Sequence, residues 1–266
     1  MKKYNRFTTW LTVALFVGCT TVPISGRRQM NLYPESTMIS MSLQAYSDFL
    51  GDANVLGMHD SRARMVRDVG DKIAASVEQY MKKINQKKRV EGFEWTFNTV
   101  DDPTVNAWCM PGGRVVFYTG ILPVCEGETG IAVVMGHEIA HAVARHGNER
   151  MSQAVMVYGA GMTLDVLTSE KPGLTRDILL QSFGIGSGLG TLAFSRNHES
   201  EADRLGMVFM AMAGYDPREA VNFWTRMSQL GGGQKPPELL STHPSDERRI
   251  RDIEAFMPEA LKYYNP

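Results

Sequence analysis

The stretch of sequence that most constrains the fold is IAVVMGHEIAHAVARHG, residues 131–147. His137 and His141 are four residues apart, so on an α-helix their imidazoles lie on one face and can bind the same metal ion. Glu138 follows His137 directly, where its carboxylate can reach a metal-bound water without being a ligand itself. This H-E-x-x-H pattern is typical of zinc hydrolases, in which the glutamate is the general base. The alternative is two ordinary histidines on an amphipathic helix.

A second segment, residues 195–213, offers a third ligand. A catalytic zinc ion is usually held by three protein side chains, and one position is left for water. The segment is predicted to be a helix, on which Glu199 and Asp203 share one face because they are four residues apart. Glu199 is the candidate third ligand, and Asp203 is the candidate hydrogen-bond partner for the second nitrogen of a ligand histidine. Without the upstream motif, this acidic pair would be interpreted as a solvated face.

The other histidines near these segments are not expected to bind the metal. The extended zinc pattern requires a glycine three residues and a histidine six residues after the second histidine. Ala144 and Gly147 occupy those positions, and His146 falls one residue early. We interpret His146 as a histidine near the helix C-terminus, where the helix dipole favours it, and Gly147 as the C-cap. His59 and His198 are interpreted as ordinary histidines.

The N-terminus has the features of an export signal. Three basic residues within the first six precede a mostly apolar run at 8–17, which is too short to span a bilayer. The run leads to Gly18-Cys19, which resembles a bacterial lipobox, although Phe16 departs from the usual residue three places before the cysteine. We therefore predict a lipoprotein signal peptide over 1–18 and lipidation at Cys19. A plain signal peptide with an incidental cysteine is the alternative.

Between residues 93 and 118 the pattern changes from helical to strand-like. Residues 93–97, 105–110 and 115–118 are rich in β-branched and aromatic residues and are separated by turn sequences. They predict a small antiparallel sheet beside the metal-bearing helix, in a mostly helical α+β domain of zincin type. The edge of such a sheet can bind a substrate backbone as an added strand. A structural hairpin without a ligand is the alternative.

Composition sets limits on the rest of the chain. Its 266 residues, 43% of them hydrophobic, suit one domain over 61–266 with an N-terminal arm over 19–60. A net charge of −1 argues against binding to nucleic acid.

The evenly spaced glycines at 184–190 lack the strand and the acidic residue of a nucleotide site, so no nucleotide is expected. The segment 178–194 is interpreted as a helical hairpin near the cleft. Two further cysteines form either a disulfide or two buried thiols: Cys109 and Cys125.

Four segments in order resemble one known family, the CAAX-prenyl-protease/HtpX family of gluzincin metallopeptidases. They are NAW followed by PGG, then HEIAHAVARHG, SRNHESEADRLG and STHPSDERRI, and the likeness covers roughly residues 60–257. The lipoprotein start makes the chain most similar to periplasmic members such as BepA and LoiP. The resemblance implies one Zn2+ per chain, bound by His137, His141 and Glu199. It also implies that Glu138 is the general base and Asp203 a supporting acid. On the strand before the metal helix, it implies two substrate-binding residues, Asn106 and Trp108.

The same resemblance directs attention to His243. It implies a loop that folds back over the zinc, with His243 either a reversible fourth ligand or a group that steadies the transition state. A histidine in a surface loop is the alternative, since histidine is common both as a ligand and at surfaces.

The function expected from these observations is zinc-dependent endoproteolysis of misfolded or misassembled cell-envelope proteins. The expected location is the periplasm, with a lipid anchor in the inner leaflet of the outer membrane, and the expected partners are polypeptide substrates. One alternative is a lipid-anchored periplasmic chaperone or assembly factor that uses methionine-rich helices and a structural zinc site. The chain contains 17 methionines, but a structural site has no need of Glu138.

Overall fold

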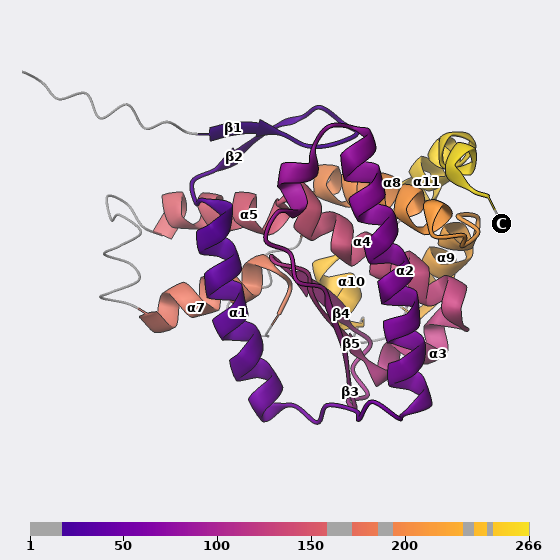
Figure 1. The fold of residues 1–266 in the computed structure, drawn as a ribbon, viewed down its shortest axis with the longest axis horizontal. Coiled ribbons are helices and arrows are strands. Elements are labelled where there is room, and N and C mark those ends of the chain that lie inside the picture. The colour runs from indigo at the N-terminus through magenta and orange to yellow at the C-terminus, as the bar shows by residue number, and fades with distance from the viewer. Residues whose placement is uncertain (1–17, 159–171, 186–193, 231–236, 244–246, 266) are drawn as a thin grey trace, which may run out of the picture.

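The structure is a computed structural model, which describes residues 18–158, 172–185, 194–230, 237–243 and 247–265. The protein is mostly helical, with one two-stranded and one three-stranded sheet, and this confirms the predicted α+β class. Figure 1 shows the three-stranded sheet between α1 (Glu35–Asp52) and α2 (Ser61–Lys83).

The three-stranded sheet has the order β3-β5-β4, so β5 lies in the middle and β4 at an edge. Its strands are β3 (Thr96–Val100), β4 (Ala107–Met110) and β5 (Arg114–Tyr118). β4 and β5 form the expected antiparallel hairpin, but β3 pairs with β5 in parallel, so the sheet is mixed. The connection after β3 carries the chain past the position of β5 to the far edge, and the hairpin then inserts β5 between the other two strands.

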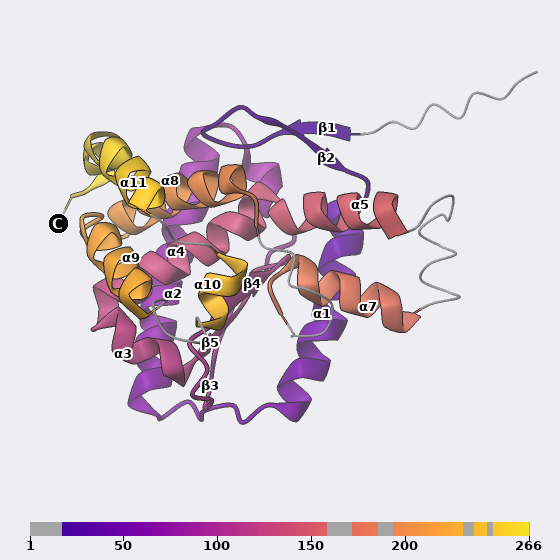
Figure 2. The ribbon, with the colours of Figure 1, turned by 180° about the vertical axis from the view of Figure 1, so that it is seen from behind.

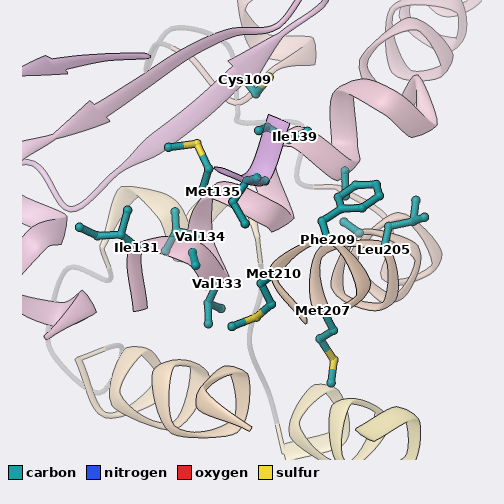
Figure 3. Close-up of a cluster of buried hydrophobic side chains, with 14 of the residues drawn as sticks. Cys109, Ile131, Val133, Val134, Met135, Ile139, Leu205, Met207, Phe209 and Met210 are labelled. Carbon is teal, nitrogen blue, oxygen red and sulfur yellow. The ribbon is translucent and has the colours of Figure 1, made fainter. Parts of the chain in front are cut away.

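α4 (Glu128–Ala144) is the central helix, and every residue from Gly130 onward is buried. It crosses α8 (Arg196–Met212) where Gly136 faces Gly206, and a Cβ atom added to Gly136 would lie only 2.8 Å from the Gly206 carbonyl oxygen. The two backbones therefore approach more closely than larger residues would allow. Apolar side chains on both sides of the crossing form the core, as Figure 3 shows: Ile131, Val133, Val134, Met135, Ile139, Leu205, Met207, Phe209 and Met210.

The metal-bearing helix ends earlier than the sequence predicts. α4 stops at Ala144, and Arg145 adopts a left-handed conformation with φ of 62°. Its amide donates to the carbonyl of Ala142. The prediction that Gly147 is the C-cap is wrong, because Gly147 lies in the first turn of α5 (His146–Tyr158). The glycine is needed there for space, since a Cβ atom would lie 1.9 Å from the ring of Phe183.

The remaining elements surround this core. The hairpin of β1 (Gly18–Thr21) and β2 (Arg28–Asn31) lies beside α5 (Figure 1). From behind, α10 (Glu238–Thr242) lies beside β4 (Figure 2), and the Leu239 amide donates to the Val105 carbonyl. The other helices and 3-10 turns are α3 (Leu122–Cys125), α7 (Pro172–Ser182), α9 (Glu219–Leu230), α11 (Glu247–Ala260), η1 (Lys87–Val90), η2 (Thr119–Ile121) and η3 (Leu261–Tyr263).

Several predictions fall partly outside the described residues. These include the signal peptide at 1–18, of which 1–17 are not described, and the glycine-rich part of the 178–194 segment. Cys19 lies in β1 opposite Met30, and its lipidation stays a prediction, as do the domain boundaries.

Two other questions are answered by the described residues. Cys109 and Cys125 are both free and buried, so they do not form a disulfide. Among the helices that the structure describes, none has the length and apolar character needed to cross a membrane.

Candidate metal centre

Four buried side chains converge on one point, and three of them are the predicted ligands His137, His141 and Glu199. The ligand atoms of His137, His141, Glu199 and His243 all lie within 4.8 Å of one another. The Nε2 atoms of His137 and His141 are 3.1 Å apart, and Glu199 Oε1 lies 3.4 Å from His141 Nε2. Two imidazole nitrogens and a carboxylate oxygen are a donor set that zinc prefers, so the residues fit the ion that the motif implies.

The positions of these ligands follow from the helices that carry them. His137 and His141 occupy successive turns on one face of α4. Glu199 lies in the first turn of α8, which begins where the Ser195 side chain accepts a hydrogen bond from the His198 amide. Because the glycine crossing holds α8 against α4, this first turn lies directly opposite the two histidines.

His243 covers the cluster from the loop after α10 and is buried. Its Nδ1 atom lies 3.2 Å from His137 Nε2 and 3.0 Å from Glu199 Oε1. The ring of Phe194 stacks on it at a centroid distance of 4.9 Å. The alternative of a surface-loop histidine therefore does not describe its position.

Glu138 has the properties of a proton acceptor beside the cluster. Its Oε1 atom is buried and has no hydrogen-bond partner among the described residues, and it lies 3.7 Å from His243 Nε2. Burial raises the pKa of this carboxyl, although the charge of His243 lowers it. An unpartnered buried carboxylate oxygen is costly unless another group is bound there, and a water molecule would supply that partner.

Asp203 lies within hydrogen-bond distance of the second nitrogen of His137. Its Oδ1 atom lies 2.9 Å from His137 Nδ1. A carboxylate can only accept, so Nδ1 carries the proton and Nε2 keeps its lone pair for a metal. Burial opposes the charge of Asp203, but the nearby cation of Arg249 lowers its pKa and keeps it ionised.

Arg249 of α11 is a functional residue that the sequence analysis missed. Its guanidinium bridges the two acids, with Nη1 at 2.8 Å from Glu199 Oε2 and Nη2 at 2.7 Å from Asp203 Oδ1. It also stacks on the Trp224 ring at 3.3 Å. The signal was present, because two buried acids require a buried cation and Arg249 lies in the quoted STHPSDERRI segment.

His146 is a second residue whose role was missed, and its interpretation as a helix C-terminal histidine is wrong. It begins α5, is fully buried, and its Nδ1 atom lies 3.0 Å from Nδ1 of His141. Its Nε2 atom lies 3.0 Å from Oε2 of Glu201. Burial lowers the pKa of His146 to about 4. His198 is also not an isolated histidine, since it stacks on His146 and bonds to Glu149.

The two predicted substrate-binding side chains are directed elsewhere. Trp108 is buried in a second apolar cluster, with its ring against Phe49 and its Nε1 atom 3.3 Å from Tyr118 Oη. Asn106 donates to Glu238 at 3.1 Å. β4 itself does pack against α4, the helix that carries Glu138. Burial, together with the charge of Glu138, raises the pKa of the Cys109 thiol. In Figure 3, Cys109 lies next to Ile139 of α4. Substrate binding by Asn106 or Trp108 stays a prediction.

Comparison with known proteins gives relatives of named activity. The "Mitochondrial metalloendopeptidase OMA1" of Schizosaccharomyces pombe is 35% identical over 93% of this chain, which spans 69% of that protein. The human "Metalloendopeptidase OMA1, mitochondrial" is 29% identical over 97% of this chain and 49% of its own length. The "Putative beta-barrel assembly-enhancing protease" of Vibrio cholerae is 33% identical over 59% of this chain and 34% of its own length.

These relatives correct the predicted location. We expected a lipid-anchored periplasmic protein, but relatives from yeasts, a plant and animals are named as mitochondrial proteins, so that prediction is wrong. Their names also give no support to the lipoprotein class or to a lipid anchor.

The enzyme class is confirmed by the same comparisons. The sequence pattern of peptidase family M48 matches residues 70–257, which include all four side chains of the buried cluster together with Glu138 and Asp203. The chain therefore belongs to peptidase family M48, and it is a metalloendopeptidase.

Proposed function

We propose that the protein is a zinc-dependent endopeptidase that cleaves misfolded or misassembled cell-envelope proteins. The observation that carries the catalytic part is the convergence of His137, His141 and Glu199 beside a buried Glu138 whose Oε1 atom has no hydrogen-bond partner among the described residues. Two relatives named beta-barrel assembly-enhancing protease support the substrate class.

In this proposal, His137, His141 and Glu199 hold one zinc ion. Zinc supplies a Lewis acid that polarises the scissile carbonyl and lowers the pKa of water toward about 7. Burial holds the pKa of His141 well below its usual value, so its imidazole is neutral and can offer a lone pair. Glu199 remains ionised despite its burial, because the charges of His243 and Arg249 hold its pKa well below the usual value.

Glu138 carries out the proton transfers. It takes a proton from the attacking water and returns it to the leaving amine, and each transfer requires a carboxyl that can hold a proton briefly. The raised pKa of the buried Glu138 favours this role, because a general base works best when its pKa approaches the working pH.

His243 covers the cluster in this structure, and we propose that it is the reversible fourth ligand. The support is its Nδ1 atom, which lies among the other donors while Nε2 faces Glu138. A peptide substrate then reaches the centre only after His243 has moved aside.

The substrate backbone is proposed to bind along β4. β5 is flanked by strands on both sides, so its backbone groups are used within the sheet, whereas β4 is an edge strand next to α4. An extended peptide can add to such an edge through main-chain hydrogen bonds, which suits a protease that accepts many unfolded sequences.

The test is Glu138→Gln, which keeps the size of the side chain and removes its basicity. We expect this variant to bind zinc in the same ratio as the wild type and to lose cleavage of casein by at least about 100-fold. Zinc content by atomic absorption and release of labelled peptides measure the two properties separately. Full cleavage by the variant would instead favour the non-enzymatic alternative, a chaperone with a structural zinc site.

A further inference from the structure

A buried polar network links the N-terminal hairpin to the metal centre. Arg27, in the turn between β1 and β2, binds Glu201 of α8 through Nε at 2.9 Å and Nη2 at 3.0 Å. The same guanidinium binds Glu149 of α5 through Nη1 and Nη2, both at 2.7 Å. Both glutamates are buried, and Ser25 of the same turn donates to Glu201 Oε1 at 2.5 Å. One short turn therefore holds two buried acids from different helices.

Glu201 in turn fixes the proton on His146. An ionised carboxylate only accepts hydrogen bonds, and His146 Nε2 lies 3.0 Å from Glu201 Oε2, so the proton of His146 is on Nε2. The neutral ring then presents a lone pair at Nδ1. His141 Nδ1 lies 3.0 Å from that lone pair and must be the donor.

This assignment has a direct effect on the ligand. When the proton of His141 is held on Nδ1, its Nε2 atom is free to bind a metal, and Nε2 is the atom that faces the other ligands. Hydrogen bonds to the second nitrogen of a ligand histidine fix both its tautomer and its ring orientation. The carboxylate of Glu201 can only accept hydrogen bonds, and it therefore sets the direction of each hydrogen bond between Arg27 and His141.

We propose that Arg27 and Ser25 of the hairpin, with Glu201 and His146, are positioning residues that set the tautomer and orientation of the zinc ligand His141. This inference rests on the zinc centre proposed above and does not depend on the substrate. The hairpin is accordingly part of the metal-binding apparatus as well as a cover for α5.

The main test is Arg27→Gln, compared with Arg28→Gln as a matched control. Arg28 is adjacent and exposed, and loses the same charge when substituted. Loss of an outer hydrogen-bond partner typically weakens metal binding by about 10- to 100-fold. Because Arg27 acts through two other residues, we expect zinc to bind about tenfold more weakly to Arg27→Gln and unchanged to Arg28→Gln, as measured by competition with a chelator.

Two readouts separate positioning from simple support of the fold. The visible absorption bands of the cobalt(II)-substituted protein report ligand geometry, and we expect them to shift in Arg27→Gln and to return toward the wild type in Arg27→Lys. Thermal unfolding of the metal-free and zinc-loaded forms shows whether the stabilisation by zinc itself decreases. A folded Arg27→Gln with wild-type zinc affinity and cobalt spectrum would overturn the proposal.

A milder variant keeps the test decisive if Arg27→Gln does not fold. Ser25→Ala removes one hydrogen bond to Glu201 and leaves the Arg27 contacts in place. We expect a smaller but measurable loss of zinc affinity, and unchanged affinity would overturn the proposal. If the wild-type chain binds no zinc, the zinc centre itself is wrong, which is a different result from a zinc-binding wild type with unaffected variants.

Discussion

The two ligand histidines of α4 are held in place by different parts of the molecule. His137 bonds directly to Asp203, which comes from the neighbouring helix α8 and is paired with Arg249. His141 instead reaches its carboxylate, Glu201, through His146, and that carboxylate is held by the N-terminal hairpin. The first arrangement is compact and fully buried, whereas Arg27 at the end of the second remains 24% exposed. The difference predicts that a substitution in the first arrangement lowers the stability of the fold more than a substitution in the second.

The largest effect is expected where both arrangements share a ligand. Glu199→Ala removes the carboxylate that faces both histidines, and it also leaves Arg249 with one buried acid fewer. Two imidazoles alone do not make a catalytic zinc site, so we expect the bound zinc to fall from one ion per chain to nearly none after dialysis. Metal analysis checks this, and a variant that retains one zinc ion would show that Glu199 is not a ligand.

The comparison itself is tested by Asp203→Asn against Glu201→Gln. Asp203→Asn removes a charge that a fully buried arginine requires, and breaking such a pair costs about 3–5 kcal/mol. Glu201→Gln leaves Arg27 paired with Glu149 and partly hydrated, so we expect a loss nearer to about 1.5–3 kcal/mol. Urea unfolding of the metal-free proteins gives both values. Equal losses would mean that the two arrangements are energetically equivalent.

The helix crossing is expected to affect both arrangements together. Gly206→Ala places a methyl group 2.9 Å from the Gly136 carbonyl carbon, so α8 must move away from α4. Overpacking of this kind typically costs about 1–3 kcal/mol, and the shift also moves Glu199. We therefore expect lower stability together with weaker zinc binding. The matched control is Gly173→Ala, where no neighbour lies within 4 Å and neither property should change.

The smallest effect is expected at an exposed pair outside the centre. Asp60 caps α2 by accepting from the Arg62 amide, and hydrogen bonds from Arg62 lower the pKa of Asp60 to about 2. A depressed carboxyl pKa stabilises the fold above the unfolded value, and this contribution is lost as the pH falls from about 4 toward 2. The stability of Asp60→Asn should therefore drop slightly less than that of the wild type as the pH falls through that window. Urea unfolding at several pH values measures both. An identical drop would show that the cap carries no pH-dependent stability.

Much of the metal centre was predictable because helical spacing is local. Four-residue spacing identifies His137 with His141, and Glu199 with Asp203, and the structure brings these two pairs together. The partners that were missed are remote in sequence. Arg249 lies 112 residues from His137, and Arg27 lies 174 residues from Glu201, so no local spacing reveals either contact.

Errors in the fold arose from equally physical causes. The sequence contains an apparent helix stop at Gly147, but the chain turns two residues earlier, at Arg145, which adopts the left-handed conformation without being glycine. Arg145 is held there by tertiary contacts, including an ion pair with Glu35 at 3.0 Å, and a single-residue propensity does not include such contacts. Likewise, alternation predicts strands well, but it does not state that β5 inserts between β3 and β4.

The distance in sequence between Arg27 and Arg249 has a consequence for the newly made enzyme. Synthesis proceeds from the N-terminus, so the hairpin is made before α4 and α8, whereas the cation that bridges Glu199 and Asp203 is made only with α11. A nascent chain in which α11 has not yet been synthesised lacks Arg249, the cation that neutralises the buried acids Glu199 and Asp203. The cluster of buried charges is therefore complete only after α11 has been synthesised.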